Sequence, residues 1–170
     1  GGGGENNLPT VDTLVLNTTD LTKNDTNQNL TAYATTSDID DDDVKVIYNW
    51  LLNESSALLL NLPFEPTGNQ LNATDYSGFD SHGNQTVNNP IYLPTGGYDG
   101  LGAWNFSSTD DELNLNNTNF PTIGTDNYAL EAWVKTNSSE AYNCIFAIDN
   151  YDPEFCVHNG NSLDLYDGGT

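Results

Sequence analysis

The sequence predicts an all-β protein, from two observations on its composition and one on its apolar pattern. Its 170 residues include 25 Asn and 19 Thr, which suit turns and exposed strand faces and are poor helix formers. Apolar residues make up 36% and aromatic residues 11%, enough for one or two thin cores and too much for a disordered acidic tail. Because no window carries a sustained 3.6-residue apolar period, we expect strands throughout.

Up to about residue 60, four strand-like runs alternate with polar turns. In the first run, alternation is expected to place Val11, Thr13 and Val15 on one face and Asp12, Leu14 and Leu16 on the other. The second and fourth runs cover residues 30–34 and 56–62. The third carries the cleanest period-two apolar stripe of the chain, which consists of Val44, Val46, Tyr48, Trp50 and Leu52.

The Trp within this third run suggests a sandwich of immunoglobulin type. Such a sandwich needs about seven strands, and only four runs precede residue 60. We therefore expect residues 1–60 to form an N-terminal extended strand and an incomplete Ig-like β-sandwich, with 1–4 excluded as a flexible glycine lead-in.

From residue 61 onward, short motifs follow one another in a characteristic order. They are Leu62-Pro63-Phe64-Glu65, Ala73-Thr74-Asp75-Tyr76-Ser77-Gly78, His82-Gly83-Asn84-Gln85-Thr86-Val87, Gly96 to Phe106, Asp110-Asp111-Glu112-Leu113, Tyr128 to Lys135 and Leu163 to Gly169. This order resembles the laminin-G-like, concanavalin A-like jelly roll of microbial surface proteins. With the preceding Ile47-Tyr48-Asn49-Trp50, it resembles archaeal and bacterial cell-surface repeats in which such a jelly roll interrupts an Ig-like module.

The resemblance covers roughly residues 44 to 170 and implies a jelly roll over residues 61–170. Two features depart from the family pattern. Phe106-Ser107-Ser108 stands where the family has Phe-Asp-Gly, and the family continues for several strands beyond the position of Thr170. Both modules are thus expected to be incomplete, either as a fragment or because neighbouring chains supply the missing strands.

The charge balance excludes several partners. With 3 Lys+Arg against 25 Asp+Glu, the formal net charge is −22. A nucleic-acid-binding domain needs cations that displace phosphate counterions, and adhesion to an anionic membrane needs them too. The longest apolar run, Cys144 to Ile148, is five residues, against about 18 for a membrane span. We expect no nucleic-acid partner and no membrane insertion.

The Asn residues predict an exported glycoprotein. Nine of them begin Asn-x-Ser/Thr with x not Pro, whereas 25 Asn among 29 Ser and Thr in 170 residues would give about four such triplets by chance. Accidental triplets in an Asn- and Thr-rich chain are the alternative. The expected N-glycan sites are Asn17, Asn24, Asn29, Asn53, Asn72, Asn84, Asn105, Asn116 and Asn137. The predicted location is extracellular, at the cell surface.

Catalytic signals are weak in this sequence. His82 and His158 are the only histidines, and neither lies in a nucleophile motif. A glucanase on a concanavalin A-like fold needs paired carboxylates, which a strand would carry at alternate positions of one face, and no predicted strand does. We expect no enzymatic activity.

Calcium is the better chemical hypothesis. Asp38, Asp40 and Asp42 crowd one loop at a spacing that suits hard oxygen coordination of Ca²⁺. The alternative is a solvated, self-repelling acidic turn.

The two cysteines, Cys144 and Cys156, are separated by an even number of residues, so they can lie on the same face of a hairpin. In an exported protein this favours a disulfide, and two buried free thiols are the alternative.

Two functions follow from these patterns. The first is a structural subunit of an N-glycosylated, pilus-like surface filament, a helical homopolymer in which protomers donate β-strands to one another. The expected donor strand carries Leu8, Val11, Leu14 and Leu16. The alternative is a calcium-dependent carbohydrate-binding adhesion module of a larger surface protein. Its candidate aromatic residues are Tyr92, Tyr98, Trp104 and Trp133, of which we expect Tyr98 at the surface and Trp133 in the core.

Overall fold

The fold is described from a computed structural model of the chain. The structure describes residues 6–23, 25–65, 72–87, 90–108, 110–116, 118–120, 128–136, 142–148, 154–158 and 162–166. Within these ranges it contains β-strands and no helix, and every strand pair is antiparallel. The all-β prediction is therefore confirmed. The chain divides into two compact units, Gly1–Leu58 and Leu59–Thr170.

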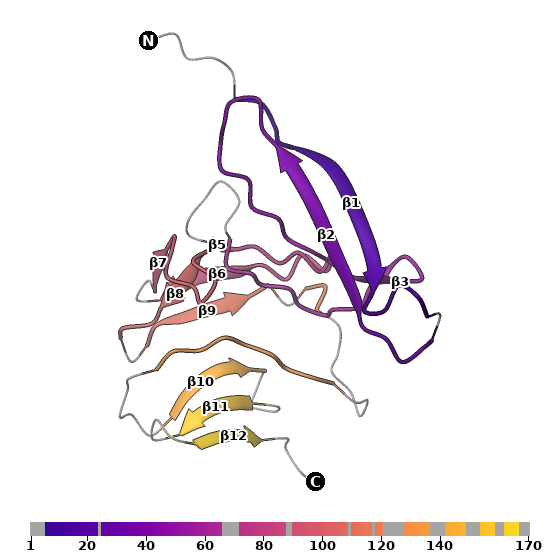
Figure 1. Ribbon diagram of the computed structural model, residues 1–170. Coiled ribbons are helices and arrows are strands. Elements are labelled where there is room, and N and C mark those ends of the chain that lie inside the picture. The colour runs from indigo at the N-terminus through magenta and orange to yellow at the C-terminus, as the bar shows by residue number, and fades with distance from the viewer. Residues whose placement is uncertain are drawn as a thin grey trace, which may run out of the picture. The chain divides into compact units, whose positions relative to one another are not determined.

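A long hairpin dominates the first unit (Figure 1). Strand β1, Thr10–Thr18, pairs with β2, Leu30–Ser37, as a two-stranded sheet. β1 is rich in Val, Thr and Leu and β2 in Thr and Ala, and the β-branched residues Val and Thr favour the extended backbone. The Thr13 and Thr35 hydroxyl oxygens lie 2.7 Å apart across the pair. The register shifts between Val11 and Thr13, which marks a β-bulge at Asp12.

The expected strand over the apolar stripe is wrong for residues 44–50, which belong to no strand. Only Leu51–Leu52 (β3) pairs, with Ser55–Ser56 (β4), and Asn53 and Glu54 make the turn at positive φ. The predicted fourth strand over 56–62 shrinks to β4. Alternation identifies which side chains share a face, but it cannot supply a backbone partner. Here the Tyr48 hydroxyl, rather than a backbone carbonyl, accepts the hydrogen bond of the Ala34 amide.

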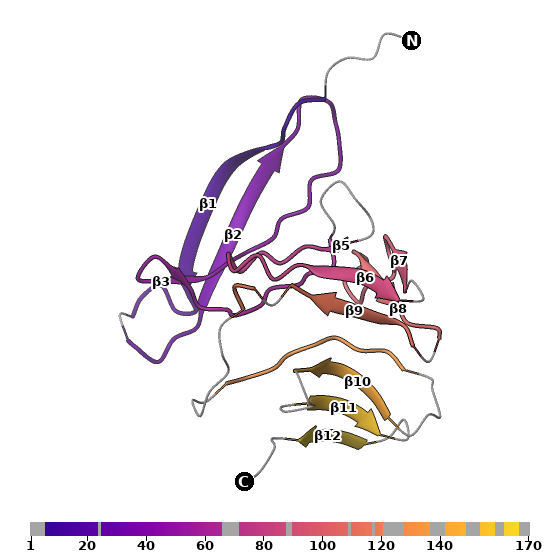
Figure 2. The same cartoon turned by 180° about the vertical axis from the view of Figure 1, so that it is seen from behind.

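Three small sheets lie in the described part of the second unit (Figure 2). The first has the order β5-β6-β9, with β5 Asn72–Ala73, β6 Gly83–Val87 and β9 Glu112–Leu115. The second pairs β7, Ile91–Leu93, with β8, Ala103–Asn105. The third is a meander of β10 Tyr142–Ala147, β11 Glu154–His158 and β12 Ser162–Tyr166. These sheets are consistent with an all-β class, and the Ig-like and jelly-roll identities of the two units stay predictions.

Few apolar side chains are buried among the described residues. The buried set consists of Ala73, Trp104, Cys156 and Val157, together with Pro90. Large apolar side chains are exposed along β1, around the stripe and on β12. None of the described segments is a helix that is long and apolar enough to cross a membrane. The exposed apolar surface of the first unit is therefore the main candidate for a functional surface.

Candidate functional site

The β1–β2 hairpin has one apolar face. Val11 lies opposite Thr36, Leu14 opposite Ala34 and Leu16 opposite Ala32. Directly paired residues share a face of the sheet, so Val11, Leu14 and Leu16 form one row, which we call the β1 apolar row. The sequence alternation had placed Val11 on the opposite face from Leu14. That expectation is wrong because the bulge at Asp12 inserts one residue and changes the alternation.

The β1 apolar row is exposed and lies on an edge strand. Leu14 is 67% exposed and Leu16 57%, and Val11 and Leu8 are exposed as well. One edge of β1 pairs with β2, and no other described strand pairs with its second edge. All four residues of the expected donor strand therefore lie at the surface, Leu8 just before β1 and the other three on it. As far as the chain is described, this segment pairs through one edge only.

The acidic turn brings its three expected ligands together. Carboxylate oxygens of Asp38, Asp40 and Asp42 lie within 4.8 Å of one another. The Asp40 carboxylate accepts hydrogen bonds from the Asn7 backbone amide, at 2.6 Å, and from the Asn7 side chain. Asp38 Oδ1 accepts the backbone amides of Asp40 and Asp42. Part of the oxygen set thus holds Asn7, shortly before β1, against the turn, and the side chains of Asp40 and Asp42 are exposed.

A carboxylate for which the sequence predicted no buried structural role organises the second unit. Asp75 is 5% exposed. Its Oδ1 accepts the amides of Asn61 and Ser77, and its Oδ2 accepts the Ser77 hydroxyl and the Ser81 amide, all within 2.7–3.0 Å. Burial by itself would raise the pKa of Asp75, but these hydrogen bonds outweigh it and hold the pKa below its ordinary value. The carboxylate is saturated by donors, so it acts as a structural anchor.

Glu65 is a second buried acid with structural partners. Its Oε1 accepts the Gly102 amide and its Oε2 the Tyr92 hydroxyl. The Tyr76 hydroxyl donates to the Glu65 backbone carbonyl, and burial followed by the Glu65 charge raises the pKa of Tyr76. A Cβ at Gly102 would collide with the Phe64 carbonyl oxygen, so only glycine fits there. The only sequence signals for this arrangement were the turn-forming glycines.

Of the two histidines, His82 has a described side-chain partner, and that partner is structural. His82 Nδ1 accepts the backbone amide of Asp75 at 3.0 Å, which gives this ring a structural role. His158 lies on β11. The absence of catalysis stays a prediction from the sequence.

The four candidate aromatics divide into a buried pair and an exposed pair. Trp104 is buried beside the half-buried Tyr92, with ring centroids 5.5 Å apart. Tyr98 and Trp133 are 81% and 74% exposed, and their rings stack at 4.3 Å with an interplanar angle of 1°. The expectation that Trp133 is a core residue is wrong. It rested on a strand over 130–134, and the structure gives residues 128–136 no strand partner.

The two cysteines form a disulfide. Cys144 of β10 lies directly opposite Cys156 of β11, so the bond staples this hairpin. Cys156 is buried and Cys144 exposed. Glu154 lies near both sulfurs, but the bonded sulfurs provide no thiolate for a metal ion.

Seven of the nine expected glycosylation sites lie in described segments, and none of the seven is buried. Asn29, Asn53, Asn105 and Asn116 are exposed, whereas Asn17, Asn72 and Asn84 are partly exposed. Asn24 and Asn137 lie outside the described residues. Asn17 and Asn29 both belong to the closed end of the β1–β2 hairpin, where Thr19 donates its backbone amide to the Asn29 carbonyl.

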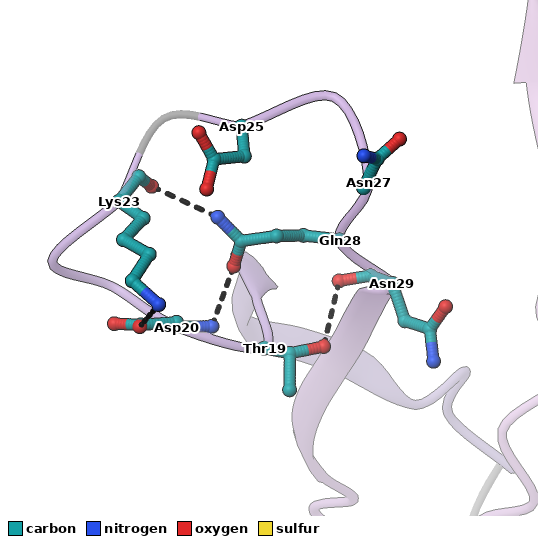
Figure 3. Close-up of a pocket in the computed structure, with 7 residues that line it drawn as sticks. All are labelled: Thr19, Asp20, Lys23, Asp25, Asn27, Gln28 and Asn29. Atoms are coloured by element: carbon teal, nitrogen blue, oxygen red, sulfur yellow. Dashed lines mark hydrogen bonds and ion pairs between the residues drawn. The ribbon is translucent and has the colours of Figure 1, made fainter.

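The loop at this closed end has a defined internal structure (Figure 3). It encloses a shallow pocket lined by Thr19, Asp20, Lys23, Asp25, Asn27, Gln28 and Asn29. The Gln28 side chain spans the loop, accepting the Asp20 amide at 2.6 Å and donating to the Lys23 carbonyl at 3.1 Å. Hydrogen bonds from Thr22 lower the pKa of Asp20, and Lys23 adds to this effect. Gln28 thereby orders the loop that presents two predicted glycosylation sites.

The fold and the surface place this chain in a broad class: acidic all-β proteins that consist of small antiparallel sheets and contain a disulfide. Comparisons with protein-family models, curated proteins and solved structures found no match. The functional argument therefore depends on the surfaces described above.

Proposed function

We propose that this protein is a structural subunit of an extracellular, N-glycosylated filament, assembled by β-strand donation between protomers. The observation that carries the proposal is the β1 apolar row on the unpaired edge of β1. Burial of a large apolar side chain is worth about 1.5–3 kcal/mol relative to exposure. Val11, Leu14 and Leu16 are 57–67% exposed, so a protomer that hides this row against a neighbour gains a corresponding part of that energy for each of them.

The unpaired edge adds a directional component. Free backbone amides and carbonyls on an edge strand are a template for another chain. Because β1 pairs with β2 through its other edge, donation needs only the second edge and the apolar row, and β1 can stay in its hairpin. This refines the expected mode, in which a free N-terminal strand leaves its own protomer.

The first unit also supports a receiving surface. Val46, Tyr48, Trp50 and Leu52 of the apolar stripe are each more than one third exposed. We propose that the stripe of one protomer receives the β1 apolar row of the next. Since donor and receiver are different patches, the contact is heterologous, and its repetition gives an open fibre when the rotation does not close.

The predicted glycans fit this arrangement. Asn17 and Asn29 occupy the closed end of the hairpin, beyond Leu16, while Val11 and Leu14 lie toward its open end. Glycans at the closed end would stay in solvent and would limit how far the hairpin can overlap a neighbour. The disulfide agrees with an oxidising, extracellular setting.

The test replaces the apolar row without removing the strand. The double variant Leu14→Ser/Leu16→Ser removes two large apolar side chains from the proposed contact, and Val15→Ser, on the opposite face of β1, is the matched control. We expect electron microscopy to show filaments for the unchanged chain and the control, and none for the double variant. Circular dichroism verifies that all three chains fold. Filaments of normal length from the double variant would refute the proposal.

The calcium-dependent adhesion module remains the second candidate, and the convergence of Asp38, Asp40 and Asp42 favours it. Calcium would be held by these carboxylates and would stiffen the turn that fastens Asn7. The expected result is a chelator-sensitive melting temperature that Asp42→Asn makes insensitive. An unchanged melting temperature of the parent chain on addition of chelator would reject calcium binding.

A further inference from the structure

We propose that the exposed Tyr98–Trp133 pair is a binding platform for neutral carbohydrates, independent of filament assembly. The two rings come from loops far apart in the sequence, yet they stack nearly parallel with centroids 4.3 Å apart. Both side chains remain more than 70% exposed, so burial in a core is not the reason for the stacking. The stack presents an aromatic surface to solvent.

The loop that carries Tyr98 is held in one conformation. The Gly97 amide donates to the Leu101 carbonyl at 2.8 Å, the Gly100 amide to the Gly97 carbonyl at 3.1 Å, and the Leu101 amide to Asp99 Oδ1 at 3.0 Å. Gly100 has a φ of 81°, which favours glycine. A turn closed by these bonds fixes Tyr98 at its apex. A ligand therefore meets a formed platform and loses little affinity to ordering it.

Two exposed charged residues border Trp133 in the sequence. Glu131 precedes it by two residues and Lys135 follows it by two, within a segment, 128–136, that forms no strand or turn. A carboxylate and an ammonium offer an acceptor and donors for hydroxyl groups. An aromatic face bordered by such groups matches a pyranose ring, which has C–H bonds on its faces and hydroxyls at its rim.

Charge and size select this ligand class over others. The net charge of −22 repels anionic polysaccharides and nucleic acids. A stable protein partner buries about 800 Å² on each side, whereas two aromatic side chains contribute about 150–250 Å² each. The platform is thus of a size for one or two sugar rings, and a neutral oligosaccharide is the occupant we infer.

The experiment titrates the full chain separately with maltohexaose, cellohexaose and chitohexaose, and follows tryptophan fluorescence and calorimetric heat. We expect at least one hexaose to bind with a dissociation constant on the order of 1 mM. Trp133→Ala and Tyr98→Ala should each weaken that binding at least tenfold without shifting the melting temperature, because both side chains are exposed. Tyr33→Ala, an exposed tyrosine on β2, is the control and should bind like the parent chain.

The proposal is wrong if the parent chain binds none of the three sugars. It is also wrong if Trp133→Ala binds as tightly as the parent chain. Light scattering on the same samples identifies another role. If the parent chain binds no sugar and Trp133→Ala changes its self-association, the platform is a contact between copies and the carbohydrate proposal is wrong. Repeating the titration with Leu14→Ser/Leu16→Ser separates this inference from the proposed function, since sugar binding should survive when filaments do not form.

Discussion

At the scale of single residues, the acidic side chains of this chain have two different roles. Most are exposed and contribute to the net charge, whereas Asp75 and Glu65 are buried and accept backbone amides from other segments. The amide of Asn61 reaches Asp75 across 14 positions, and Gly102 reaches Glu65 across 37. These two carboxylates bring loops together where the apolar core is thin.

Replacement of Asp75 by alanine should therefore destabilise the second unit. The change leaves the buried amides of Ser77 and Ser81, and the part-buried amide of Asn61, without their acceptor. Unsatisfied buried donors cost about 1–3 kcal/mol each. We expect the free energy of unfolding in urea to fall by at least 2 kcal/mol, on the order of two such donors. Asp43→Ala, at an exposed position, is the control and should change it by less than about 0.5 kcal/mol. Equal stability of the two variants would show that Asp75 is not an anchor.

The same carboxylate predicts a pH dependence. The folded-state pKa of Asp75 lies below its ordinary value of 3.8, so its stabilising effect is present above pH 3.8 and is lost as the pH falls through the folded pKa. The stability difference between the parent chain and Asp75→Ala should accordingly be constant near neutral pH and shrink below about pH 3.8. Urea titrations at successive pH values measure it. A difference that grows on acidification would contradict the assigned direction of the pKa shift.

At the scale of elements, hairpins are the units that recur: β1–β2, β3–β4, β7–β8 and β10–β11–β12 all join neighbours in sequence. Short-range pairing suits a chain with many Asn and Gly turns. The disulfide between Cys144 and Cys156 closes one of these hairpins across 12 positions. A cross-link restricts the unfolded chain, and for a loop of this length the effect is about 3 kcal/mol.

The Cys144→Ala/Cys156→Ala variant tests this contribution. It should lower the free energy of unfolding by about 2–4 kcal/mol, and reductant should lower the stability of the parent chain to a similar level. The variant itself supplies the control, because reductant should not affect it. If reduction leaves the parent chain as stable as before, the disulfide does not contribute to the stability of this unit.

These elements also indicate how far the sequence could predict the structure. The lack of helices in the described segments was predicted from composition, and the even spacing of Cys144 and Cys156 around a turn favoured their disulfide. Residues 44–50 carry a strand pattern without forming a strand, because pairing depends on a neighbour that local alternation does not reveal. The bulge at Asp12 moves Val11 to the other face through a register shift that the chain alone does not show. The buried role of Asp75 could not be predicted either, because one of its donors, Asn61, comes from a separate segment.

At the scale of the whole molecule, charge opposes association. Each protomer carries a formal net charge of −22, so copies in contact repel one another, and the proposed filament forms only if the apolar contact outweighs that repulsion. Salt screens charges over a Debye length that falls from about 30 Å at 0.01 M to about 8 Å at 0.15 M. Burial of the β1 apolar row depends much less on salt over this range.

Filament assembly should therefore increase with ionic strength. We expect protomers at low salt to stay dispersed and to assemble when NaCl is raised from about 0.01 to 0.15 M, since screening weakens repulsion beyond about 8 Å. Light scattering follows the mass, and electron microscopy verifies that the product is fibrous. CaCl₂ at matched ionic strength distinguishes screening from specific binding at Asp38, Asp40 and Asp42. If CaCl₂ promotes assembly more than NaCl does, and Asp42→Asn abolishes the difference, calcium binds at this site. Assembly that weakens as NaCl rises would mean that charge pairs hold the protomers together, and the apolar donation of β1 would then be wrong.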